Sequence, residues 1–132
     1  TGENAAEAKI VKLYGQVPPI TKMDASLNNL TNCEHLQLST NSIDKISVAL
    51  TGLKSLKILS LGRNVIKKIE KLDDLADNLA ELWISYNQIA SLDGLAALTA
   101  LTTLYMSNNQ LKSFAELEKL ASLPNLKDVL FY

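Results

Sequence analysis

Apolar residues recur along the chain in a pattern that combines two spacings. The stretch Leu79-Ala-Glu-Leu82-Trp-Ile84-Ser-Tyr-Asn87-Gln-Ile89 alternates apolar and other residues from Leu82 to Ile84 and then reaches an asparagine. Alternation with period two predicts a short strand whose apolar side chains face inward. Beyond the asparagine the apolar spacing lengthens toward three and four, which predicts helical or 3₁₀ segments with one buried face. Such segments are expected at Leu72-Leu75-Ala76-Leu79, Leu92-Leu95-Leu98-Leu101 and Leu117-Leu120-Leu123.

The whole pattern repeats at a fixed period. Four units carry the asparagine at the same place, with spacings of 23, 23 and 22 residues between Asn41, Asn64, Asn87 and Asn109. This self-similarity is typical of a leucine-rich-repeat solenoid, whose units stack to bury a common core. We therefore predict an α/β fold with short parallel β-strands on a concave face and helical or 3₁₀ segments on the opposite face.

The repeats also define the expected domain organisation. Residues 1–7 are polar and small and predict an N-terminal tail. Residues 8–132 predict one leucine-rich-repeat domain of about five repeats plus an incomplete sixth, which begins at Leu126 and stops at Tyr132. The first repeat is degenerate, as terminal repeats often are. Because the last unit halts before an asparagine could appear, we expect the chain to be a fragment of a longer protein.

The aligned asparagines, Asn41, Asn64, Asn87 and Asn109, invite interpretation as a polar site, but a structural role explains them better. Backbone N–H and C=O groups lose their partners where the chain leaves a strand and turns inside a coil. An asparagine amide can satisfy both kinds of group. We interpret the four residues as a structural asparagine ladder.

Residues between the inward-facing ones point outward, and most of them are small and polar. Serines at positions 39, 60, 85 and 107 follow that expectation, whereas Ile58, Trp83 and Tyr105 do not. These three residues fall on three consecutive predicted strands about 4.8 Å apart, so their side chains are expected to form one contiguous patch. Leu130 would extend the patch on the last strand.

Polar and charged residues border this predicted patch. Glu81 lies on the same strand as Trp83, and Arg63, Tyr86 and Asn108 lie at the rim, just before the asparagine turns. Aromatic residues beside an arginine are the composition of an interaction hot spot. We predict a protein-binding surface made of Ile58, Arg63, Glu81, Trp83, Tyr86, Tyr105 and Asn108.

Composition and charge exclude several classes of function. The formal net charge is -1, which gives no electrostatic reason to expect nucleic acid or an anionic membrane as a partner. No apolar run approaches the ~18 residues of a membrane span. The single cysteine, Cys33, cannot form a disulfide within the chain, and a reducing, cytosolic-type compartment is the better prediction.

The sequence offers no set of residues suited to catalysis or to binding a metal or cofactor. Cys33 and His35 are two residues apart and on a strand would share one face, yet no third residue is placed to orient them. One cysteine and one histidine supply too few metal ligands. No catalytic or phosphate-binding sequence motif is present. We therefore expect a non-catalytic protein that needs no cofactor.

Several long runs are specific beyond a generic repeat: Leu59-Ser-Leu-Gly-Arg-Asn64-Val-Ile-Lys-Lys-Ile-Glu70, Glu81-Leu-Trp-Ile-Ser-Tyr-Asn-Gln-Ile-Ala-Ser-Leu92, Leu104-Tyr-Met-Ser-Asn-Asn109 and Pro18-Pro19-Ile20-Thr-Lys-Met-Asp24. These runs resemble the leucine-rich-repeat light chains of outer-arm axonemal dynein. The resemblance covers about residues 8–130. It implies a non-catalytic subunit of ciliary and flagellar dynein, found in the cytoplasm and in the axonemal cytoskeleton.

The resemblance also implies a partner and a site. Members of that family dock on a dynein heavy chain, at the microtubule-binding domain at the tip of the stalk, and are proposed to tune motor activity. Tubulin in the microtubule is a further candidate partner. The family's contact carries over to Trp83, Tyr105, Ile58 and Tyr86. The family continues beyond the end of this chain through a further repeat and a C-terminal helix, whose roles cannot be assigned here.

Two other classes of binding protein share these features. A phosphatase-regulatory leucine-rich-repeat scaffold has repeats of about 22 residues and the same cytosolic chemistry. An RNA-associated repeat protein of the spliceosomal kind is the third hypothesis, and a flat salt dependence of RNA binding would argue against it.

Overall fold

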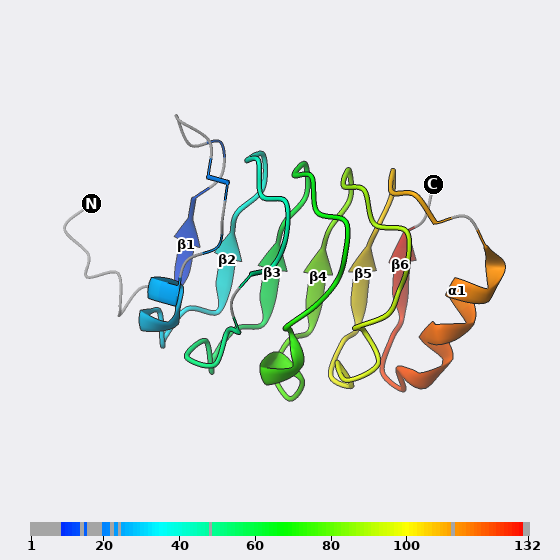
Figure 1. Ribbon diagram of the computed structural model, residues 1–132. Coiled ribbons are helices and arrows are strands. Elements are labelled where there is room, and N and C mark those ends of the chain that lie inside the picture. Colours follow the sequence, from blue (N-terminus) through cyan, green and yellow to red (C-terminus); the bar gives the residue numbers. More distant parts are fainter. Residues whose placement is uncertain are drawn as a thin grey trace.

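The computed structural model describes residues 9–13, 15, 20, 21, 23, 25–47, 49–111 and 113–130, and its strands stand side by side in one sheet (Figure 1). Within that part of the chain the sheet has six parallel strands, each paired with the next along the sequence. They are β1 (Ile10–Lys12), β2 (His35–Gln37), β3 (Ile58–Ser60), β4 (Glu81–Trp83), β5 (Thr103–Tyr105) and β6 (Asp128–Leu130). The predicted leucine-rich-repeat solenoid is confirmed. The tail predicted over residues 1–7 lies outside the described residues.

Each strand is centred on an inward-facing apolar residue. The register aligns Val11, Leu36, Leu59, Leu82, Leu104 and Val129 in one row across the sheet. Leu59, Leu82 and Leu104 are completely buried. The strands span three residues, but the hydrogen bonding continues one residue further, for example from Leu61 N to Trp83 O at 2.7 Å. The second apolar residue of each unit therefore also faces the core, as its period predicts.

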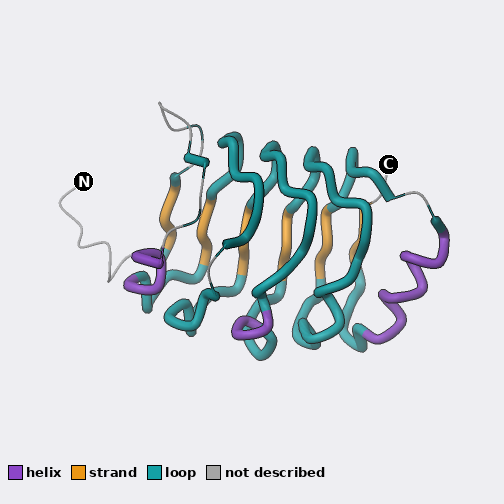
Figure 2. The backbone as a smooth tube through the Cα atoms, viewed as in Figure 1, coloured by secondary structure: helices purple, strands orange, loops and turns teal. Residues whose placement is uncertain are grey.

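The connecting segments pass from each strand to the next, and the helices lie along the lower edge of the view and, for the last of them, at the C-terminal end of the stack (Figure 2, purple). These helices are short: η2 (Ala25–Asn29), η3 (Asp73–Leu75), α1 (Phe114–Glu118) and η4 (Lys119–Ser122). The predicted helical segments after Leu72 and around Leu117 are confirmed by η3 and by α1 with η4. No helix among the described residues is long and apolar enough to cross a membrane.

The helical or 3₁₀ segment predicted from Leu92 to Leu101 is wrong. The structure has three successive turns there, in which the N–H groups of Leu95, Leu98 and Leu101 each bond to the carbonyl three residues earlier. Gly94 prevents a continuous helix here because its φ of 96° lies outside the helical range. A Cβ at this position would come within 2.1 Å of the Ile69 carbonyl oxygen, so only glycine fits. An apolar spacing of three is satisfied equally well by stacked turns.

The asparagines at the end of each strand bond to backbone groups in their own and neighbouring coils. Asn64 is buried, and its Oδ1 accepts from Ile43 N at 3.1 Å. Its Nδ2 donates to Leu61 O at 2.9 Å and to Leu38 O at 3.1 Å. Asn87 repeats the arrangement one coil further on, with Ile66 N as donor and Leu61 O as an acceptor. Within the described residues no buried side-chain nitrogen or oxygen lacks a partner.

A second set of asparagines links coils in the segments that lead into the strands. Asn78 Nδ2 donates to Lys54 O at 2.5 Å, and Asn125 Nδ2 donates to Thr99 O at 2.9 Å. Asn28 both donates to Ala49 O and accepts from Gly52 N. Asn78 and Asn125 occupy the same place in their repeats, four residues before the central residue of the following strand, whereas Asn28 lies four residues earlier in its own repeat.

An ionic cluster fastens α1 and η4 to the preceding coil. Glu116 Oε2 accepts from Leu92 N at 2.8 Å and from Ser91 Oγ at 3.1 Å. Lys119 Nζ lies 2.8 Å from the same carboxylate oxygen and 2.7 Å from Asp93 Oδ1. The Lys119 ammonium is the main cause that lowers the pKa of Glu116, and the Leu92 N–H adds to it. Lys119 also lowers the pKa of Asp93.

Replacing Glu116 by Gln is expected to destabilise the C-terminal coil at neutral pH and to have less effect in acid. A carboxyl with a lowered folded pKa stabilises the fold fully above its unfolded pKa and loses that contribution as pH falls through the folded value. The difference in thermal midpoint between wild type and Glu116→Gln should therefore be constant between pH 7 and 5 and shrink below the ordinary value of 4.5. Glu118→Gln, an exposed change on the same helix, is the matched control. A difference that persists unchanged in acid would contradict the role given to the ionised carboxylate.

Candidate protein-binding surface

The outward face of the sheet carries two rows of side chains, one on each side of the buried central row. The first positions of the strands form one row, and the third positions form the other. The register of the six strands aligns Ile10, His35, Ile58, Glu81, Thr103 and Asp128 in the first row, and Lys12, Gln37, Ser60, Trp83, Tyr105 and Leu130 in the second. The side chain of Leu130, predicted to extend the patch, lies outside the described part of the chain.

Three aromatic rings meet on this face, and we name His35, Trp83 and Tyr105 the aromatic ridge. The centroids of Trp83 and Tyr105, on neighbouring strands, lie 5.8 Å apart with the ring planes tilted by 41°. The centroids of His35 and Trp83 lie 5.6 Å apart in an edge-to-face arrangement with an interplanar angle of 73°. Both distances lie within the range at which aromatic pairs attract each other.

His35 joins this ridge from two strands away. It lies on β2 and Trp83 on β4, so their rings meet above β3. Ser60 on β3 is only 5% exposed, and its Oγ is hydrogen-bonded to His35 Nε2 at 3.2 Å. His35 lies in the first outward row of the register but was not predicted as part of the binding surface, because residues on non-adjacent strands touch only when a long side chain spans the gap. The large side chain of Trp83 was the one indication in the sequence that a contact across an intervening strand was possible.

The polar atoms within the ridge are largely engaged. Trp83 Nε1 donates to Glu81 Oε1 at 3.1 Å, so the indole N–H is satisfied by a residue of the same strand. Burial lowers the pKa of His35, the charge of Glu81 partly opposes that effect, and Lys12 lowers the pKa further. The imidazole is therefore neutral at pH 7. The ridge presents an apolar, uncharged surface beside the Glu81 carboxylate.

Ile58 does not share a row with Trp83 and Tyr105. It is paired in the register with His35 on one side and Glu81 on the other, whereas Trp83 is paired with Ser60. Ile58 is half-buried and lies diagonally to Trp83. The three residues therefore lie on consecutive strands but in two rows, because Ile58 precedes the central leucine of its strand whereas Trp83 and Tyr105 follow theirs. That they form one contiguous patch stays a prediction.

The predicted rim residues stand in the turns before the asparagine ladder. Thr40, Arg63, Tyr86 and Asn108 all have φ near 60°, a left-handed conformation that favours glycine. The Arg63 guanidinium lies 4.2 Å from the centroid of the Tyr86 ring, a cation–π contact, and the Tyr86 side chain is 47% exposed. Arginine and an exposed tyrosine therefore stand together at the edge of the sheet.

Cys33 and His35 do not form a pair. Cys33 is fully buried, and burial raises the pKa of its thiol. The expectation that both side chains share one face is wrong, because β2 begins only at His35 and the period of a strand does not extend back to Cys33. Among the described residues no three His, Cys, Asp or Glu side chains are grouped as metal ligands would be.

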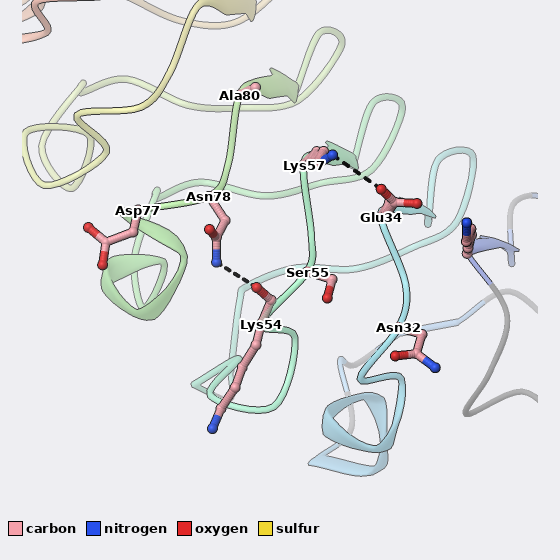
Figure 3. A pocket seen from close by; sticks show the side chains of 9 residues that line it. Asn32, Glu34, Lys54, Ser55, Lys57, Asp77, Asn78 and Ala80 are labelled. Atoms are coloured by element: carbon pink, nitrogen blue, oxygen red, sulfur yellow. Dashed lines mark hydrogen bonds and ion pairs between the residues drawn. The ribbon is translucent and has the colours of Figure 1, made fainter.

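A hollow of about 720 Å³ lies at the amino-terminal ends of the first four strands (Figure 3). It is lined by Lys9, Asn32, Glu34, Lys54, Ser55, Lys57, Asp77, Asn78 and Ala80. Lys57 and Glu34 form an ion pair at 3.2 Å. Small-molecule sites are lined mainly by hydrophobic and aromatic side chains, whereas every residue that lines this hollow except Ala80 is of a polar or charged type. The hollow is therefore a weaker candidate than the aromatic ridge.

Comparison with known proteins agrees with the fold. The family described as "Leucine Rich repeats (2 copies)" matches residues 77–119. The structure of an internalin C2 from Listeria monocytogenes superposes with a TM-score of 0.76 at 31% identity, covering 92% of this chain and 51% of that one. The fold and the repeats thus define a leucine-rich-repeat protein.

Closer relatives narrow the assignment. Dynein axonemal light chain 1 of Danio rerio is 60% identical over 131 residues, which are 99% of this chain and 68% of the relative. The chain belongs to the dynein axonemal light chain 1 family. The Chlamydomonas reinhardtii member is 60% identical over 126 residues, which are 96% of this chain and 63% of that protein. The chain thus spans about two thirds of the length of these relatives.

Proposed function

We propose that the chain is a non-catalytic, protein-binding light chain of ciliary and flagellar outer-arm dynein. It acts in the axoneme, a cytoskeletal structure, where it docks on a dynein heavy chain and tunes motor activity. The docking site on the heavy chain is the microtubule-binding domain at the tip of the stalk. The relatives at 60% identity are named axonemal dynein light chains, which supports the class of partner.

The aromatic ridge is the observation that supports the sheet face as the docking surface. Its rings are partly exposed and mutually in contact at 5.6 Å and 5.8 Å. Tryptophan, tyrosine and arginine are the residues most enriched among binding hot spots, and Arg63 with Tyr86 stands at the edge of the same face. Ile58, Glu81 and Asn108 complete the proposed surface.

Binding between purified proteins tests this function. The chain is titrated by isothermal calorimetry with a recombinant dynein heavy-chain microtubule-binding domain and, in parallel, with a protein phosphatase catalytic subunit. We expect saturable one-to-one binding to the dynein domain with a negative heat-capacity change, because the contact buries apolar surface. Binding to the phosphatase instead would favour the phosphatase-regulatory scaffold. Absence of binding to the dynein domain would overturn the proposal.

A further inference from the structure

Trp83 is held from several directions before any partner arrives. Glu81 fixes the indole N–H at 3.1 Å, and the Tyr105 ring lies against it at 5.8 Å from the neighbouring strand. His35 meets it from the other direction at 5.6 Å. A side chain with two torsion angles and three such contacts has little rotamer freedom left.

His35 is itself anchored. Its Nε2 is hydrogen-bonded to the Oγ of Ser60, a residue almost completely buried beneath the two rings. The bond ties the imidazole to the strand that lies between β2 and β4. His35 is therefore placed to stop the indole from rotating away across β3, a role that no residue of β3 itself fills.

We propose that His35 is a positioning residue of the docking surface, which holds the Trp83 indole over β3 as a rigid anchor for an apolar side chain of the partner. The identity of the partner in this inference rests on the proposed function. The positioning of Trp83 by His35 is a property of the free chain and does not depend on that function. Ordering a side chain during binding weakens affinity, and an anchor that is already ordered avoids that cost.

The bonds already made define the chemistry that the anchor accepts. The indole N–H is occupied by Glu81 and the imidazole Nε2 by Ser60, so neither is available to a partner. On the described part of the ridge, the Tyr105 hydroxyl and the second imidazole nitrogen, His35 Nδ1, have no hydrogen-bond partner. The ridge thus fits an aliphatic or aromatic side chain over Trp83, with a polar group of the partner at Tyr105.

Fluorescence of the single tryptophan tests the positioning without any partner. His35→Ala should free the indole, raise its acrylamide quenching constant about twofold and lower its emission anisotropy. His35→Phe restores an edge-to-face ring contact and should return both values to within about a quarter of wild type. Ser39→Ala changes a residue of the same coil, two residues beyond the end of β2, and should alter neither the quenching constant nor the anisotropy. Wild-type quenching and anisotropy in His35→Ala would overturn the proposal.

A pH titration supplies a readout that a purely structural role would not give. Protonated imidazole quenches indole emission, so acidifying the wild-type chain from pH 7.5 to 5 should dim Trp83 with a midpoint below the ordinary 6.5 of histidine. Glu81 on β4 and Lys12 on β1 are the charged groups that influence His35. His35→Phe should abolish the transition. A transition that persists in this variant would show that His35 does not contact the indole.

Binding to the microtubule-binding domain then tests the consequence for the partner. His35→Ala should weaken binding about threefold to tenfold, and His35→Phe by less than about twofold. If the wild-type chain does not bind this domain, the proposed function fails while the fluorescence result still decides the role of His35. Altered fluorescence with unchanged affinity would overturn the claim that the rigid indole is the anchor.

Discussion

Replacing Trp83 by Ala should weaken binding to the dynein heavy-chain domain about 30-fold to 1000-fold. Hot-spot residues contribute about 2–4 kcal/mol when truncated, and a central tryptophan in contact with two other rings is the strongest candidate on this face. The truncation removes the ring from the partner's contact and also leaves His35 and Tyr105 without their neighbour. Isothermal calorimetry measures the loss, and circular dichroism checks that the variant is folded.

Two further variants separate the tryptophan from general effects. Val65→Ala shortens another exposed apolar side chain, 38% exposed and located beyond the ladder asparagine, and should leave the affinity within about twofold of wild type. Trp83→Phe keeps an aromatic ring but loses the bond to Glu81, and should fall between wild type and alanine. Full affinity in Trp83→Ala would remove the sheet face as the docking surface.

Replacing Asn64 by Ala should lower the free energy of unfolding by about 4 kcal/mol, which is a large part of the stability of a domain of this size. The amide oxygen is the partner of the Ile43 N–H, which would be left buried without an acceptor. The bonds to Leu61 O and Leu38 O would also be lost, although each carbonyl keeps another asparagine as donor. The orphaned N–H is therefore the largest single contribution.

Urea unfolding followed by circular dichroism measures this effect. Asn32→Ala is the matched control, because Asn32 is exposed in a turn and should change the free energy of unfolding by less than about 0.5 kcal/mol. The half-buried Asn41, near the end of the stack, should cost less than Asn64. A loss below about 1 kcal/mol for Asn64→Ala would mean that water replaces the amide and that the ladder bonds contribute little.

The sequence predicts the scaffold well because the scaffold is periodic. Period two at Leu82 and Ile84 predicts a strand with two buried residues, and the exposed fraction of each is at most 1%. The segment from Leu92 to Leu101 shows the limit of this reasoning. Helices and stacked turns bury an apolar residue at nearly the same interval, and the positive φ of Gly94 decides between them.

The candidate site is predicted less completely for a different reason. That Trp83 and Tyr105 point outward follows from the pleat of a strand, and the register pairs them as neighbours. That His35 touches Trp83 depends on side-chain torsion angles across an intervening strand, which no spacing in the sequence encodes. The row occupied by Ile58, by contrast, follows from the aligned repeats, because Ile58 precedes Leu59 whereas Trp83 follows Leu82.

The left-handed turns before the asparagine ladder set a balance between stability and chemical diversity. Glycine would adopt a φ near 60° at lower energy than Thr40, Arg63 or Tyr86, by about 1 kcal/mol at each turn, and by less than that for Asn108, because asparagine tolerates this conformation. The chain instead carries a different side chain at each turn and displays all four along one edge. Each coil contacts mainly its neighbours, so such a position can change without altering the buried leucines of distant coils. The edge is therefore a place where new specificities can evolve one repeat at a time, at a small and local cost in folding free energy.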